Sequence, residues 1–370
     1  MKFSTLIYIA LLFSGMADYA HAENPVLIGW SGPMTGNCAV VGVDSAAAVQ
    51  LAIDQANAAG GVAGRQLKLV VEDDGYETTQ AVGAYKKLVS QNGARLVIAN
   101  TYGGVFATAR DALRDGAMVI DPLDCNDDIA ALPENTFCLA TRTESITNAF
   151  VQDISRNRFK SVLLLVEESD GWMQLVARNT RLSLEKAGVS VKEEFVSPTE
   201  GSFRPLLLRA RQARVEALII LGNDQMGLAP REMRELGMPA QIYGVGSILS
   251  PGFRALAGES IEGARVSSWL APRTAKYSDF LKTFEEKFGR KPALELATMP
   301  SYDVASILIQ CLQKTLPGSG EVDTEKMRNC ILGQHDFDGL TGSISFDPDG
   351  AVRSIHERLY EIRDGQLSGI

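Results

Sequence analysis

The segment from residue 24 to residue 74 constrains the fold of this chain more than any other part of the sequence. An apolar run at 25–30 is followed by a loop rich in Gly, Pro and Thr at 31–36, a helical pattern at 44–58 and a second apolar run at 67–71. This order predicts a right-handed βαβ unit. Because open α/β folds bind small ligands at the carboxyl ends of their strands, the loop is a candidate binding loop.

Several helices and a late strand can also be placed from local signals. Asp44 and Ser45 are both good N-caps, so we expect the first helix to begin at one of them, and to end at Gly60. Amphipathic patterns predict two late helices at 277–288 and 303–314. The segment that begins at Thr341 and runs to Gly350 is expected to form a strand that leaves into a turn.

Short apolar runs alternate with helical patterns twice along the chain. The strands expected after the first βαβ unit lie at 96–100 and 117–120, and the series restarts with 162–166, 189–196, 217–221 and 241–246. The strands of the first series are short apolar runs without polar alternation, as expected when both faces of a parallel sheet are covered. The two series predict an α/β fold with two doubly wound parallel-sheet lobes.

The first 22 residues have the pattern of a cleavable signal peptide. Lys2 precedes a short apolar run, and Ala20-His21-Ala22 is a small-x-small cleavage site, so we expect cleavage near Ala22. The apolar run is far shorter than the ~20 residues of a membrane span. The first cysteine is Cys38, too far away for a lipoprotein anchor. We therefore expect a periplasmic or secreted protein that does not insert into the membrane.

Length and charge limit the function classes. The 370 residues less a 22-residue leader leave 348, more than one core usually supports, which favours two lobes. The formal net charge is −9, without a cluster of Lys or Arg, so neither nucleic acid nor an anionic membrane is an expected partner.

The sequence gives no support for catalysis, a metal or a cofactor. Of three histidines, one lies in the leader, and the others are His335, in a polar loop, and His356, in an expected strand. Neither belongs to a catalytic or zinc-binding motif, and there is no Walker loop or G-x-S-x-G elbow. We interpret Asp73-Asp74 as loop-capping residues and Glu167-Glu168 as solvated lobe surface. We expect a binding protein, not an enzyme.

The five cysteines suit an oxidising compartment. Cys125 and Cys138 flank one turn-rich loop, and Cys311 and Cys330 flank another, so we favour these two disulfides with Cys38 free. Each would contribute roughly 3 kcal/mol through the loop it closes. A bond between Cys38 and Cys125, in loops at the same sheet edge, remains an alternative.

Five fragments in order show that the chain resembles the leucine/isoleucine/valine-binding family of type I periplasmic solute receptors. They are Ile28-Gly29 with Gly32-Pro33-x-Thr35-Gly36, Asn57-Ala-Ala-Gly-Gly-Val-Ala-Gly-Arg65, Glu72-Asp-Asp74, Gly116-Ala-Met-Val-Ile120 and Phe346-Asp-Pro-Asp-Gly350. The resemblance covers essentially the whole chain after the leader. It implies two lobes joined by a three-strand hinge: an N-terminal lobe of residues 23–142 plus 271–347, and a C-terminal lobe of residues 143–270 plus 348–370.

The resemblance also implies a role and a set of ligand contacts. The role is that of the capture subunit of an ABC importer, which takes a small polar molecule between its lobes and delivers it to a membrane permease. Such a subunit is expected to be a monomer. The positions that match the family's contacts, with their neighbours, are Tyr102, Gly103, Gly104, Asp124, Cys125, Trp172, Asn223 or Asp224, Gly246 and Ser247.

The matched positions lack the serine, the threonine and the acidic residue with which the family binds an α-amino acid. Asp124 offers a carboxylate in another place, and a buried acid needs a donor partner. An amine, amidine or amide ligand is then favoured if Asp124 contacts it.

Two other functions fit parts of the pattern. A periplasmic sensor that hands its closed state to a signalling protein would show the same closure; a pull-down with a permease or a kinase would separate the two. An exported hydrolase on a similar fold is the weaker alternative, because a nucleophile motif and a placed imidazole are missing. Turnover of an ester, amide or glycoside would support it.

Overall fold

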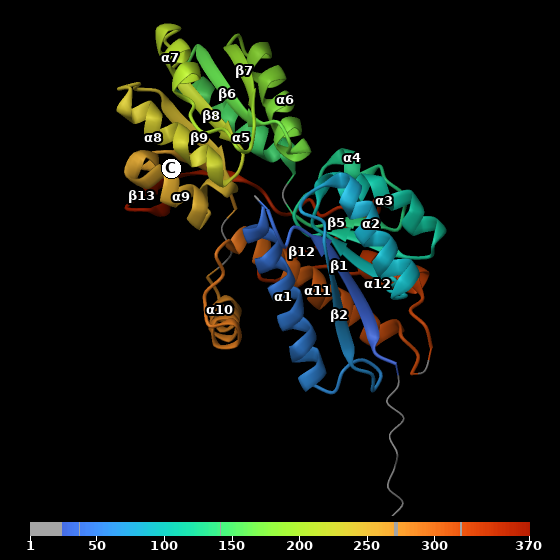
Figure 1. The fold of residues 1–370 in the computed structure, drawn as a ribbon. Coiled ribbons are helices and arrows are strands. Elements are labelled where there is room, and N and C mark those ends of the chain that lie inside the picture. Colours follow the sequence, from blue (N-terminus) through green and yellow to red (C-terminus); the bar gives the residue numbers. More distant parts are fainter. Residues whose placement is uncertain (1–23, 37, 141, 270–272, 319) are drawn as a thin grey trace, which may run out of the picture.

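The chain builds two lobes, each around its own β-sheet (Figure 1). The computed structural model describes residues 24–36, 38–140, 142–269, 273–318 and 320–370. The signal peptide expected at residues 1–22 lies outside these described residues. No helix in the described part of the chain is both long enough and apolar enough to cross a bilayer.

The first sheet has five strands, all parallel, in the order β2-β1-β3-β4-β5. The strand order reverses between β1 and β3, which makes their carboxyl ends a topological switch point. The strands are β1 (Val26–Gly32), β2 (Leu67–Asp73), β3 (Leu96–Ala99), β4 (Met118–Asp121) and β5 (Thr136–Cys138).

The second sheet has seven strands in the order β14-β13-β10-β9-β8-β6-β7. Its first five strands along the chain are parallel, whereas β13 and β14 join antiparallel at one edge. The switch point here lies between β6 and β8. The strands are β6 (Ser161–Glu167), β7 (Ser190–Val196), β8 (Ala217–Leu221), β9 (Gln241–Val245), β10 (Arg265–Ser268), β13 (Arg358–Arg363) and β14 (Gln366–Gly369).

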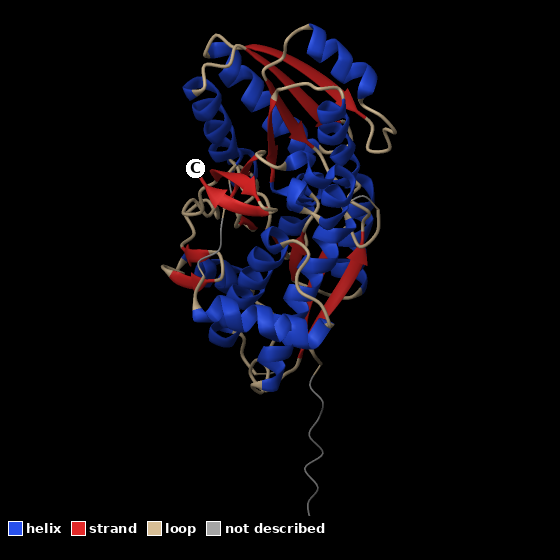
Figure 2. Cartoon of the chain, turned by 90° about the vertical axis from the view of Figure 1, so that its left-hand side faces the viewer, coloured by secondary structure: helices blue, strands red, loops and turns tan. Residues whose placement is uncertain are grey.

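Helices cover both faces of each sheet, as Figure 2 shows for the upper, second lobe. The first lobe contains α1 (Ala39–Ala58), α2 (Thr78–Lys86), α3 (Tyr102–Arg114), α4 (Asp127–Ala130), α10 (Ala275–Phe288), α11 (Glu295–Thr315) and α12 (Thr324–Leu332). The second lobe contains α5 (Thr143–Arg156), α6 (Gly171–Lys186), α7 (Arg204–Gln212), α8 (Leu228–Glu235) and α9 (Pro251–Ala257). A hairpin of β11 (Phe337–Gly339) and β12 (Gly342–Ile344) lies beside α11.

Because helices cover both faces of each sheet, the central strands carry apolar side chains on both faces. In β3, Leu96 and Ile98 belong to the core shared with α1 and α11, whereas Val97 belongs to the core under α2 and α3. In β6, Leu163 and Leu164 belong in the same way to the two cores of the second lobe. Every second residue of these two central strands faces the opposite helix layer, so both faces of each strand carry apolar side chains.

The chain passes between the lobes three times (Figure 1). The first passage joins β5 to α5, and the second joins β10 to α10. Before the third passage, Ala351 forms a parallel bridge to Cys138, and the Val352 N–H donates to the Cys138 carbonyl at 3.1 Å. The chain therefore stays beside the first sheet as far as Val352 and then runs into β13 of the second sheet.

Two helix starts differ from the sequence prediction. α1 begins at Ala39 rather than at Asp44 or Ser45, and both of these polar side chains are buried. The Asp44 carboxylate accepts hydrogen bonds from the Ala293 and Leu294 N–H groups at 2.6 and 2.8 Å. It thereby fixes the start of α11 at Glu295, earlier than the predicted start at 303.

The late strand predictions were partly wrong. Within 341–350 the strand is only β12, and the chain leaves it through a turn held by the Gly350 N–H to Asp347 carbonyl bond at 2.8 Å. His356 lies in the irregular segment before β13 instead of in a strand, while His335 lies in a loop as predicted.

Candidate ligand-binding site

A cavity of about 140 Å³ lies between the two lobes, at the carboxyl ends of the strands of both sheets. Loops that follow β1, β2 and β4 form its first-lobe wall, and loops that follow β6, β8 and β9 form its second-lobe wall. The start of α11 and the segments that pass between the lobes complete it through Leu294, Leu296, Trp269 and Glu357. Both topological switch points thus open onto one space.

The loop after β4 places Asp124 in the first-lobe wall. The Asp121 carboxylate accepts from the Leu123 and Asp124 N–H groups at 2.8 and 2.9 Å, which fixes this turn. The Asp124 side chain is 7% exposed, and none of the described residues donates a hydrogen bond to its carboxylate. Burial raises the pKa of Asp121 to about 7, and burial together with Asp121 and Asp170 raises the pKa of Asp124 well above its usual range.

The loop after β2 places Tyr76 in the same wall. Asp74 accepts from the Tyr76 N–H at 3.0 Å and from the Thr101 hydroxyl at 2.7 Å, and Asp73 accepts from the Met34 N–H and the Thr35 hydroxyl. These contacts confirm that Asp73 and Asp74 cap loops. Tyr76 has φ of 65°, in the left-handed region where a tyrosine is strained. Strain of this kind is held where the surrounding structure requires it, often at binding sites.

The start of α6 places Trp172 in the second-lobe wall. Asp170 is the N-cap of this helix and accepts from the Trp172 and Met173 N–H groups, each at 3.0 Å. The Trp172 ring is half-buried, and its indole N–H has no hydrogen-bond partner in the described structure. Burial and the nearby Glu167 raise the pKa of Asp170 to about 6.

Glu167 is not solvated surface, so that prediction was wrong for this residue. It is 2% exposed, and its carboxylate accepts from the Asn223 N–H at 2.9 Å. The carboxylate therefore holds the loop after β8 and sets Asn223 in the wall of the cavity. Glu168, the next residue, is exposed as predicted.

The loop after β9 brings the lobes into contact. The Ser247 hydroxyl donates to the Gly222 carbonyl at 2.7 Å, which leaves the serine in the cavity wall. A Cβ added to Gly246 would lie 2.0 Å from a methyl carbon of Leu296, at the start of α11. Gly246 is therefore required for close approach of the two lobes, whatever it contributes to a ligand.

Five of the predicted contacts line this cavity: Asp124, Trp172, Asn223, Gly246 and Ser247. Tyr102 and Asp224 lie outside it. The Tyr102 hydroxyl accepts from the Asn126 side-chain amide at 3.0 Å, and its ring borders a separate groove between α3 and α6. The Asp224 carboxylate accepts from the Ser250 hydroxyl, so it serves the start of α9.

Three more predicted contacts serve packing. A Cβ on Gly103 would lie 2.0 Å from the Thr78 hydroxyl, and one on Gly104 would lie 2.6 Å from Ala81, so both glycines allow α3 to pack on α2. Cys125 is fully buried and forms a disulfide with Cys138. These residues hold the first lobe together beneath the cavity.

The disulfides have the predicted pairing. Cys125 is bonded to Cys138 and Cys311 to Cys330, while Cys38 is a free thiol. The alternative bond between Cys38 and Cys125 is therefore absent. Cys38 lies in the cavity wall, where burial and nearby carboxylates raise its pKa.

Several cavity residues were missed by sequence reasoning. Cys38, Tyr76, Asp170 and Trp269 each follow a strand, so a strict search after every strand end would have found them. Other lining residues carry no such signal, because they come from the start of α11 and from the third passage between the lobes: Leu294, Leu296, Ala297 and Glu357.

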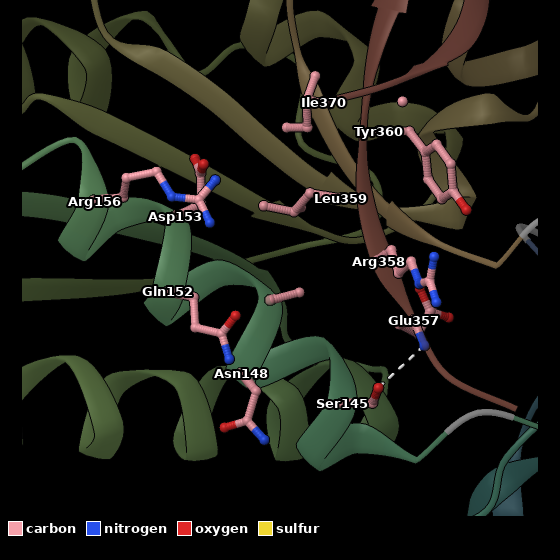
Figure 3. Close-up of a pocket in the computed structure, with 12 residues that line it drawn as sticks. Ser145, Asn148, Gln152, Asp153, Arg156, Glu357, Arg358, Leu359, Tyr360 and Ile370 are labelled. Atoms are coloured by element: carbon pink, nitrogen blue, oxygen red, sulfur yellow. Dashed lines mark hydrogen bonds between the residues drawn. The ribbon is translucent and has the colours of Figure 1, made fainter. Parts of the chain in front are cut away.

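A larger groove of about 460 Å³ lies on the second lobe between α5 and β13 (Figure 3). Its charged side chains are of both signs, including Arg156 and Arg358 with Asp153. Asp153 already accepts from the Tyr243 hydroxyl and pairs with Arg265. Because this groove is built from one lobe, it would not respond to lobe movement, and we keep the interlobe cavity as the candidate site.

The described residues contain no group of three or more His, Cys, Asp or Glu side chains arranged to hold a metal ion. The carboxylates at the cavity come from separate loops, and Asp170 is committed to the α6 N-terminus. What the arrangement can do chemically is bind a small molecule with charge and apolar contacts.

The chain belongs to the periplasmic binding protein family, whose sequence model matches residues 25–365. It is 26% identical over 364 residues to the leucine-, isoleucine-, valine-, threonine-, and alanine-binding protein of Pseudomonas aeruginosa, covering 96% of this chain and 94% of the relative. Members of this family bind solutes and are not catalysts.

Solved structures share the fold at low identity. The substrate-binding protein of a branched-chain amino acid transporter from Streptococcus pneumoniae, in complex with isoleucine, superposes with a TM-score of 0.82 at 21% identity, covering 93% of this chain and 98% of that one. A solute-binding protein of an ABC transporter from R. palustris, in complex with benzoate, superposes with a TM-score of 0.81 at 16% identity. The match covers 94% of this chain and 96% of that one. The fold is thus that of a type I periplasmic binding protein, as the sequence predicts.

Proposed function

We propose that this chain captures a small polar molecule, an amino acid or a related amine or amide, between its lobes and delivers it to the membrane permease of an ABC importer. One observation carries the proposal: the small cavity at the carboxyl ends of the strands has walls from both lobes and contains a buried carboxylate, Asp124, without a partner among the described residues. The names of the relatives and of the solved structures, which speak of amino acid binding and of an ABC transporter, support it.

Closure of the lobes supplies the mechanism. A ligand that contacts Asp124 on one side and Trp172 on the other bridges the lobes and stabilises the closed arrangement relative to the open one. A differential affinity of a few kcal/mol is sufficient to shift such a balance. A permease that recognises the closed form then receives only loaded protein.

The proposal also includes a cellular location and the boundaries of the two lobes. A signal peptide at residues 1–22 would export the chain to the periplasm, where the permease is accessible. We propose an N-terminal lobe of residues 23–142 with 271–347 and a C-terminal lobe of residues 143–270 with 348–370. One boundary changes: the contacts of Ala351 and Val352 with Cys138 favour a third crossing after Val352.

Thermal-shift screening tests capture directly. Purified protein without its leader is heated with amino acids, amides, amines, polyamines and aromatic acids. A ligand at 100 times its dissociation constant should stabilise the protein by about 2.7 kcal/mol. Small-angle scattering with that ligand should show a more compact particle. Stabilisation by no member of these classes contradicts the proposal, and co-purification with a permease tests delivery.

The variant Trp172→Ala tests the bridging contact. Its ring is half-buried at a helix start, so we expect the free protein to keep its melting temperature within a few degrees while the ligand-induced shift is lost. An aromatic contact of this kind contributes about 1 kcal/mol beyond its buried area. A collapse of the free protein would show that Trp172 is a core residue instead.

A further inference from the structure

The charge of the interlobe cavity is of one sign. Three carboxylates line it, from Asp124, Asp170 and Glu357, and no Lys or Arg is among its described lining residues. The carboxyl end of β6, beside the cavity, carries a further buried acid, Glu167. A negatively charged group that entered this space would therefore meet only like charges.

The three carboxylates are not equivalent. Asp170 binds two N–H groups of α6, and Glu357 accepts from the Ser267 hydroxyl at 3.0 Å. Asp124, with more than nine-tenths of its side chain buried, receives no hydrogen bond from the residues that the structure describes. A buried carboxylate needs a cation or donors, and here that partner must come from the cavity.

The other lining residues suit the uncharged part of a small organic cation. Trp172, Trp269 and Tyr76 present aromatic rings, and Val41 and Leu296 add aliphatic surface. Aromatic faces attract ammonium groups as well as apolar groups. The volume of about 140 Å³ restricts the ligand to a small molecule.

The cavity offers little to a free carboxylate. Two of its side-chain donors are already engaged: the Ser247 hydroxyl donates to the Gly222 carbonyl, and the Asn223 amide lies against Glu167. The Trp172 indole N–H remains a donor, but it carries no charge. The Thr101 hydroxyl, near the predicted first-lobe contacts, donates to Asp74. A zwitterion would bring a carboxylate into a space where no described side chain neutralises it.

We infer that the ligand is a small organic cation, an amine or amino amide without a free carboxylate, whose ammonium group pairs with Asp124. The inference rests on the proposed function and specifies its ligand class. An amino acid amide fits because it keeps the ammonium group and replaces the carboxylate with a neutral amide. The Trp172 indole N–H is a donor available to the amide oxygen.

Sets of ligands that share one hydrocarbon skeleton and differ only in their charged groups test this ligand class. Calorimetric titrations at pH 7 compare 3-methylbutylamine, leucinamide, leucine and 4-methylpentanoate, and a parallel set compares phenethylamine, phenylalaninamide, phenylalanine and 3-phenylpropanoate. The amine or the amide should bind at least tenfold more tightly than the zwitterion of the same skeleton, and the acids should not bind. Tighter binding of a zwitterion or an acid overturns the inference but leaves solute capture intact. If neither these ligands nor the wider screen of solutes binds, the proposed function fails as well.

Two variants separate the role of Asp124 from folding. Asp124→Asn keeps the shape and removes the charge; Asp128→Asn is the matched control, because Asp128 is exposed on the neighbouring helix α4. The first should weaken amine binding at least tenfold without lowering the melting temperature of the free protein, and the control should bind as the unmodified protein does. Unchanged amine affinity in a folded Asp124→Asn protein overturns the inference.

Discussion

Asp124 shows at the residue scale how a binding site conflicts with stability. Its carboxylate is buried near Asp121 and Asp170 without a cation, which destabilises the ligand-free protein. Residues of this kind are retained for function at a cost in stability. The same burial makes Asp124 a strong partner for a cation that enters the cavity.

This conflict predicts the effect of Asp124→Asn on the free protein. Removing the charge should raise the free energy of unfolding by about 1 kcal/mol, a gain of the size found when functional residues are replaced. Urea unfolding of both proteins at pH 7 without ligand measures the difference. A loss of stability instead would show that Asp124 has a structural partner.

Asp170 lies in the same cavity but has a structural role as well. Because it caps α6 through the Trp172 and Met173 N–H groups, Asp170→Ala should lower the free energy of unfolding by about 1 kcal/mol. Asp170→Asn keeps the acceptor oxygen and should lose much less. Equal losses in the two variants, measured by urea unfolding, would contradict the capping role.

At the scale of elements, strands were predicted better than helix starts. The central strands β3, β4, β6 and β8 are apolar runs buried on both faces, so their sequences carry the signal directly. The start of α11 depends on Asp44, which is about 250 residues away along the chain, and no local pattern reveals such a contact. Asp44 and Ser45 were read as caps of their own helix because their role in the folded chain is tertiary.

The bond between Cys311 and Cys330 links α11 to α12. It closes a loop with a sequence separation of 19, so the double variant Cys311→Ala/Cys330→Ala should lose about 3 kcal/mol of stability. The measurement is the urea midpoint of the variant against the oxidised protein. An unchanged midpoint would mean that the packing of α12 alone holds this end of the lobe.

At the scale of the whole molecule, the sequence located part of the site. Asp124, Trp172 and Asn223 were found because they match the family's contact positions, and each follows the carboxyl end of a strand, where parallel topology brings loops together. Leu296 and Glu357 could not be found in this way, since they enter the cavity only through the arrangement of the lobes. Gly103 and Gly104 matched a family pattern, but their backbone packs against α2.

The buried acids predict a dependence of stability on pH. Burial raises the pKa of Asp121 to about 7 and that of Asp170 to about 6, from an ordinary value of 3.8. Between these values the folded state binds more protons than the unfolded state, so their contribution to stability is lost as the pH rises from about 4 to about 7. Urea unfolding across this range should show a steeper decline in the unmodified protein than in Asp121→Asn/Asp170→Asn. Parallel curves of unfolding free energy against pH for the two proteins would contradict this prediction.

Ligand affinity should change in the opposite direction. The carboxylates that line the cavity are those of Asp124, Asp170 and Glu357, with Asp121 and Glu167 buried next to them. Binding of a cation favours the ionised forms of Asp124 and Asp170, whose pKa values burial raises. Amine affinity should therefore increase from pH 5 to pH 7 with release of protons. Calorimetry in buffers of different ionisation enthalpy measures that release, and proton uptake would contradict the account.

The crystal structure of the protein with its tightest-binding amine tests the central claim most directly. The account predicts the ligand between the two lobes, with its ammonium nitrogen about 3 Å from the Asp124 carboxylate and its body against Trp172. A ligand held in the groove between α5 and β13, or an interlobe cavity that stays empty in crystals grown with that saturating amine, would contradict it.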